Sequence, residues 1–140
     1  METSYRLFSG VLTALLALFT PIAPLLISTL VFIFIDFLTG VFADRRTTLK
    51  KGEAWYFESH KAWRTILKAG LALTSIVMAW LLEHYILTFL TLHAARLTAG
   101  FICGVELWSF LENASELSDA PIFRILRRYA HRQIRQHLDH

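Results

Sequence analysis

Long apolar runs separated by short charged stretches dominate the chain. Residues 63–85 and 86–112 are each about as long as the roughly 20 residues that a helix needs to cross about 30 Å of hydrocarbon. Only a short polar turn around Glu83 to Tyr85 lies between them. We therefore expect two transmembrane helices here that form a tight antiparallel hairpin.

The first apolar run is too long for one ordinary span. Pro21 and Pro24 interrupt it, and each proline removes a backbone donor and crowds the preceding turn. The pattern predicts a helix over 7–20, a bend, and a full span over 25–43. In the alternative, the first segment is a kinked or interfacial helix and only three helices cross the membrane. The expected fold is an all-α integral membrane bundle of four, possibly three, transmembrane helices.

The C-terminal segment, residues 119–140, has a different pattern. After Pro121, apolar residues recur at roughly helical spacing among basic ones, which predicts a basic amphipathic helix on the cytoplasmic side. Such a helix lies in a membrane interface or packs against a neighbouring subunit, and a solvated, frayed tail is the alternative. The arginines expected to contact lipid or a partner are Arg124, Arg127, Arg128, Arg132 and Arg135. Residues 1–118 then form the transmembrane domain.

Composition agrees with membrane insertion. Of the 140 residues, 55% are hydrophobic and 18% are charged, and the mean hydropathy is +0.47. A soluble domain of this size needs fewer apolar residues for its core, so the excess must face lipid. The net charge of +3 comes from basic residues that flank apolar helices. Anionic lipid headgroups, rather than nucleic acid, are therefore the expected partner.

The distribution of Lys and Arg predicts the orientation, because cytoplasmic connections are enriched in both. Residues 44–68 carry seven of them and the tail carries five, so both segments belong in the cytoplasm. An even number of spans joins these segments, so the two assignments agree with each other. Four spans also place Arg6 and the N-terminus in the cytoplasm, whereas three spans place them outside.

Two carboxylates, Asp36 and Glu106, fall inside apolar spans. An unpaired carboxylate there costs at least ~2.5 kcal/mol, so each needs a partner. By residue count, both lie about two turns from the cytoplasmic end. Lys61, Arg64 and Lys68 share one face of the intervening helix. We predict a buried cluster of Asp36, Lys68 and Glu106 that locks three helices together; a proton or ion relay is the alternative role.

Other chemistry is sparse. Gly100 and Gly104 offer a close-approach surface to another helix, within the chain or between subunits. Arg96 is expected to snorkel outward or to pair with Glu83. The histidines lack metal-ligand spacing, the lone Cys103 has no disulfide partner, and no phosphate loop, nucleophile elbow or catalytic carboxylate pair occurs. We expect no metal, no cofactor and no enzymatic activity.

Three short motifs, in order, resemble those of the toxin-secretion and phage-lysis holin family, of the phage holin family 4 type. They are similar to its Asp-aromatic-x-Thr-Gly signature, its serine-to-lysine spacing and its Glu-x-x-Ser-x-x-Glu-Asn segment. The matching positions are Asp36, Thr39 and Gly40; Ser59 and Lys68; and Glu106, Ser109, Glu112 and Asn113. Together they cover roughly residues 25–118.

The resemblance implies a small multi-pass protein of the bacterial inner membrane. Such a protein oligomerises and permeabilises the membrane, so that an endolysin or toxin reaches the cell wall. The alternative is a membrane scaffold without a pore, whose cytoplasmic linker and tail dock a cytosolic protein. A proton-coupled carrier would rest on the buried acids alone, because no inverted repeat is visible.

Overall fold

The computed structural model describes residues 2–118, 121, 125 and 128–129, and its regular elements are helices throughout. The amphipathic helix predicted for residues 119–140 falls mostly outside the described residues. In chain order the elements are α1 (Glu2–Leu18), the 3-10 turn η1 (Thr20–Ile22), α2 (Ala23–Lys50), α3 (Ser59–Leu81), the π-helical turn η2 (Leu82–Ile86) and α4 (Ala94–Leu117).

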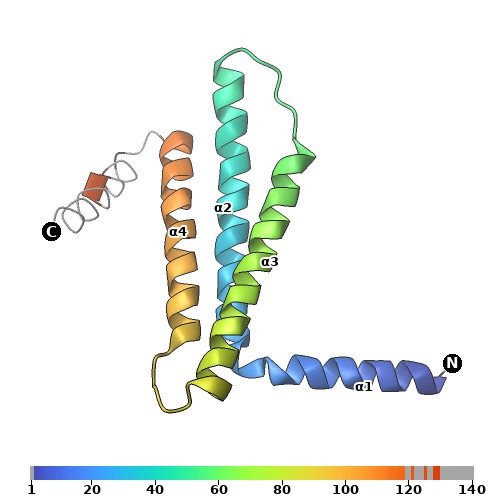
Figure 1. Cartoon of the computed structure of the whole chain (residues 1–140). Helices are drawn as coiled ribbons and strands as arrows, with labels where there is room; N and C mark the ends of the chain where they lie inside the picture. The colour runs from blue at the N-terminus through green and yellow to red at the C-terminus, as the bar shows by residue number, and fades with distance from the viewer. Residues whose placement is uncertain (1, 119–120, 122–124, 126–127, 130–140) are drawn as a thin grey trace.

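Helices α2, α3 and α4 run side by side in alternating directions (Figure 1). The segments Thr20–Lys50, Ser59–Ile86 and Ala94–Leu117 are each long and apolar enough to cross a membrane. Only 17%, 11% and 17% of their most apolar stretches are buried within the chain. The remaining apolar surface must face lipid or another protein, because exposing so large an apolar surface to water is unfavourable. An all-helical bundle with three such helices is therefore the established part of the predicted fold.

Helix α1 lies crosswise to this bundle, at the end opposite to the α2–α3 linker (Figure 1). It contacts the rest of the chain chiefly through η1, and its large side chains, such as Tyr5 and Phe8, are exposed. Pro21 and Pro24 produce the change of direction. Pro21 lies in η1, whose last amide donates to the carbonyl of Phe19 at 3.1 Å, and Pro24 opens α2. Prolines are tolerated at such starting positions, where a backbone donor has no helical partner.

A small apolar core holds the three long helices together near the α1 end. It comprises Ile22, Ile76, Trp80, Ala95 and Ala99. The two alanines let α4 approach its neighbours closely, which matters in a membrane, where helices associate through van der Waals contact rather than through release of water.

The connection between α3 and α4 differs from the predicted tight hairpin. After Leu81 the chain makes the π turn η2, in which the Leu87 amide donates to the Leu82 carbonyl at 2.8 Å. Residues 87–93 are not helical, and α4 begins only at Ala94. His93 precedes it in the left-handed region, with φ 48°. The apolar character of this loop hides it in the sequence, because a hydropathy pattern cannot separate an apolar loop from the helix that follows.

Gly100 and Gly104 do not mediate a close approach between described helices of this chain. A Cβ added at either position would meet nothing within 4 Å. The described residues thus give no support to packing within the chain, and contact with another subunit stays a prediction.

A candidate functional site: the charged cluster between three helices

One side chain from each long helix contributes to a charged cluster. Lys68 of α3 places its Nζ 2.7 Å from Glu106 Oε2 of α4 and 3.3 Å from Asp36 Oδ2 of α2. Asp36 and Glu106 are buried, at 7% and 4% exposure. The structure thus brings together the three residues from which the sequence predicts a polar cluster.

An amide and a glycine complete the cluster on the side of α2 and α4. Asn113 Nδ2 donates to Asp36 Oδ1 at 3.1 Å. Gly40 lies one turn along α2 from Asp36, and a Cβ there would lie 3.4 Å from Asn113 Nδ2. Such a Cβ would only touch the amide, whereas a larger side chain would displace it from the carboxylate. Thr39, between them, bonds to its own helix through the carbonyls of Ile35 and Asp36.

The cluster holds two carboxylates against one ammonium, so its balance of charge depends on Lys68. A buried ion pair offsets its desolvation only with good geometry and satisfied hydrogen bonds. Both conditions hold, since every buried side-chain nitrogen and oxygen of the described residues has a partner. The Lys68 side chain remains 44% exposed. A groove of about 330 Å³ reaches it, lined by Lys61, Arg64, Thr65 and Lys68.

The other predicted site residues lie elsewhere on the helices or beyond the described chain. Ser59 is the exposed first residue of α3, nine positions before Lys68, or roughly 13 Å along the axis. Ser109 and Glu112 are half-buried on α4. Arg128 is helical and exposed. The remaining tail arginines, Arg124, Arg127, Arg132 and Arg135, lie outside the described residues.

Comparison with known proteins decides the family. A family model for the bacteriophage holin family matches residues 13–132, which include the whole charged cluster. The chain belongs to this family. No curated protein and no solved structure matches the chain. The resemblance drawn from the three motifs is therefore confirmed, and the chain is an integral membrane protein of a pore-forming family that is not enzymatic.

This holin has a second polar cluster at the linker end of the bundle. Asp44 Oδ2 accepts hydrogen bonds from Lys61 Nζ at 2.9 Å and from Trp55 Nε1 at 3.1 Å. The guanidinium of Arg45 lies 5.8 Å from the centroid of the Trp55 ring. These contacts fasten the linker to α2 and α3. The sequence does not reveal this cluster, because the spacing of Asp44, Trp55 and Lys61 follows no helical period.

Arg46 makes a further contact that the sequence did not reveal in this holin. Its Nη1 donates to the carbonyl oxygens of Glu116, at 3.1 Å, and of Leu117. These carbonyls belong to the last turn of α4, where unsatisfied backbone groups give a partial negative charge that favours a cation. The end of α2 is thereby tied to the end of α4, immediately before the tail.

Proposed function

We propose that this chain oligomerises in the bacterial inner membrane and permeabilises it, so that an endolysin or toxin reaches the cell wall. Membership of the holin family and three membrane-length helices support the proposal. The observation that carries it is the Asp36, Lys68 and Glu106 cluster, which places charged groups among apolar helices. Such groups are rare within membranes and mark functional sites there.

The cluster acts in this proposal as a lock on the resting subunit. While the three helices are packed together, the charges of the cluster satisfy one another. When subunits rearrange around a common axis, the same charges supply a polar surface that water can wet. The groove that reaches Lys68 already connects the cluster to the molecular surface. Locking and lining a pore are thus successive roles of the same residues.

The subunit contact in this proposal includes the open face of α4. Gly100 and Gly104 have no neighbour within 4 Å of an added Cβ among the described residues. Phe101 and Val105, which follow them around the helix, are exposed. Small residues beside exposed apolar ones allow a second helix to approach closely, as helix pairs in membranes do.

For the topology, we propose three crossings with the linker and the tail in the cytoplasm. The linker region and the tail hold most of the chain's 14 Lys and Arg residues, as the cytoplasmic side requires. The 17 residues of α1 rise only about 25 Å, less than the hydrocarbon thickness. Helix α1 then lies along the outer interface with the N-terminus outside. Four crossings, with both termini in the cytoplasm, are the alternative.

Cysteine labelling distinguishes these topologies. Both variants are made in a Cys103→Ser background and treated with a membrane-impermeant maleimide. Ser4→Cys should react in intact cells once the outer membrane is permeabilised. Glu53→Cys, in the linker, should react only after the cells are broken open. Protection of both positions until lysis would support four crossings instead.

The function is tested by inducing the chain in cells and following membrane potential with a fluorescent dye. We expect the potential to collapse after a delay. Asp36→Ala should change the time of collapse, because it removes the ion pair between α2 and Lys68 of α3. An unchanged potential at high expression, with the protein shown to be in the membrane, would overturn the proposed permeabilisation.

A membrane scaffold without a pore is the second candidate. The favouring observation is that two fastened elements, the linker held by Asp44 and the end of α4 held by Arg46, lie at the same end of the bundle. They form a base on which a cytosolic protein could dock. Recovery of one stoichiometric cytosolic partner, without any change in permeability, would favour this candidate over the pore.

A further inference from the structure

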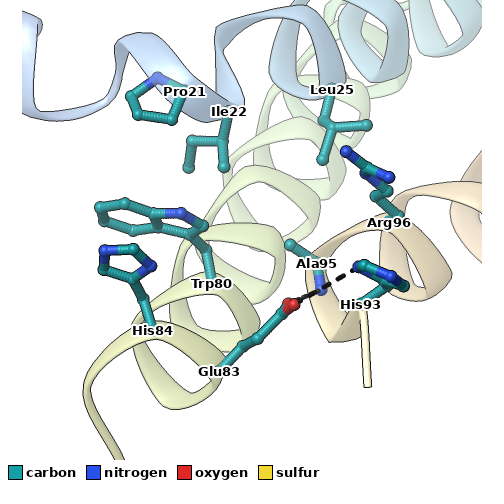
Figure 2. Close-up of a pocket in the computed structure, with 9 residues that line it drawn as sticks. All are labelled: Pro21, Ile22, Leu25, Trp80, Glu83, His84, His93, Ala95 and Arg96. Carbon is teal, nitrogen blue, oxygen red and sulfur yellow. Dashed lines mark hydrogen bonds and ion pairs between the residues drawn. The ribbon is translucent and has the colours of Figure 1, made fainter. Parts of the chain in front are cut away.

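A second polar pocket lies at the α1 end of the bundle, opposite to the Lys68 cluster. It has a volume of about 240 Å³ and lies where η1, the end of α3 and the start of α4 meet. One wall is apolar and includes Leu25 and Trp80. The polar groups are Glu83, His84, His93 and Arg96 (Figure 2).

Glu83 is a fixed carboxylate in this pocket. Its Oε2 accepts a hydrogen bond from the Ala95 amide at 3.4 Å, and its Oε1 lies 3.7 Å from His93 Nδ1. The Ala95 amide is one of the unsatisfied donors of the first turn of α4, where a negative charge is favourable. The carboxylate therefore stabilises the start of α4, and the Glu83 side chain remains 24% exposed.

Two stacked rings form the aromatic side of the pocket. Trp80 and His84 lie nearly parallel, with centroids 5.3 Å apart and planes 13° apart. Figure 2 shows them beside Glu83, facing the same space. Because His84 covers one face of the indole and Trp80 is only 9% exposed, the Glu83 carboxylate is the group in this pocket that attracts a cation.

Arg96 supplies the opposite charge at the rim of the pocket. Its guanidinium lies beside Leu25 in Figure 2, and among the described residues it makes no hydrogen bond or ion pair. From the sequence we expected Arg96 either to snorkel outward or to pair with Glu83. The pairing is absent, and the Glu83 carboxylate contacts Ala95 and His93 instead. An unpaired guanidinium and a fixed carboxylate thus flank one pocket, and their formal charges sum to zero.

We propose that this pocket binds the phosphoethanolamine headgroup of a phospholipid. The phosphate is held by Arg96, since guanidinium recognises phosphate with paired donors. The ammonium lies against the Glu83 carboxylate. The pocket is at the end of helices of membrane length, at the level where headgroups lie, and Leu25 continues its wall towards the acyl chains.

The charges favour this headgroup over an anionic one. Phosphatidylglycerol offers a phosphate to Arg96 but no cation to Glu83, so the carboxylate would meet only neutral hydroxyl groups. The site does not depend on permeabilisation, because its residues belong to a different end of the bundle from Asp36, Lys68 and Glu106. Its role would be to fix the α1 end of each subunit at the headgroup level.

Native mass spectrometry of the full chain in a nonionic detergent tests the site. Phosphatidylethanolamine and phosphatidylglycerol are titrated separately, and we expect the former to be retained at about tenfold lower concentration, the effect of one charge-assisted contact. Arg96→Gln should weaken retention of both lipids by a similar factor. Arg64→Gln, at the opposite end of α3, is the matched control and should leave the preference unchanged.

A change in the lipid keeps the test independent of folding. N-acetylated phosphatidylethanolamine lacks the ammonium charge, so the unaltered protein should lose its preference for it. Equal retention of the acetylated and native lipids, equal retention of phosphatidylglycerol, or an Arg96→Gln variant that binds as the parent does would each overturn the site. Soluble phosphoethanolamine that binds as tightly as the lipid would overturn the lipid as its occupant.

Discussion

Replacing Lys68 with methionine removes the ammonium that bridges Asp36 and Glu106. Methionine preserves side-chain length and helix propensity, so the change is chiefly electrostatic. The two carboxylates, 7% and 4% exposed, would lose their cation. Removing one partner from a buried ion pair costs about 3–5 kcal/mol. Because the Lys68 side chain is 44% exposed, we expect the lower end of that range, about 3 kcal/mol.

The assay is unfolding of the purified chain in mixed micelles by increasing SDS, followed by tryptophan fluorescence. Lys50→Met, at the exposed end of α2, is the matched control and should change the free energy of unfolding by less than about 0.5 kcal/mol. Adding Asp36→Asn and Glu106→Gln to Lys68→Met should recover much of the loss, because no uncompensated charge remains. A Lys68→Met variant as stable as the control, or a triple variant that is the least stable of all, would show that Lys68 does not compensate the two carboxylates.

Three further substitutions probe separate contacts. Gly40→Leu should displace the Asn113 amide from Asp36 and cost about 1–3 kcal/mol in the same titration, whereas Gly40→Ala should cost much less; equal stability of the two would contradict the close approach. Asp44→Ala removes the acceptor that fastens the linker through Trp55, so trypsin should cut the 51–58 linker faster than in a Glu53→Ala control, and an unchanged rate would refute the fastening. Gly104→Leu should leave the stability of the subunit unchanged but reduce the cross-linked oligomer; an unaltered oligomer would exclude this face of α4 as the contact.

The charged cluster can be predicted from the sequence because the acids inside the membrane need a counter-charge, and the helical spacing places a lysine within reach. A carboxylate among apolar side chains needs a cation, and Asp36 and Glu106 lie at similar depths from the charged ends of their spans. Lys68 is the basic residue that lies deepest in the intervening helix. Pairing within a membrane is thus more predictable than pairing on a soluble surface, where water can replace a missing partner.

The contacts at the two ends of the bundle cannot be predicted in this way, because they involve irregular segments. Asp44 meets Trp55 and Lys61 through the path of an irregular linker, which has no period from which a pairing can be inferred. Similarly, the loop 87–93 is apolar enough to resemble helix, although His93 adopts a left-handed conformation. The sequence therefore predicts the three long helices well and the connections that orient their ends poorly.

Pore formation is tested most directly by dye release from liposomes that contain the purified chain, measured together with the size of the complex in detergent. We expect that an oligomer forms and releases dye, and that Lys68→Met alters the onset of release while Lys50→Met does not. A monomer that inserts with the expected topology and leaves the liposomes sealed at every ratio of protein to lipid would contradict it.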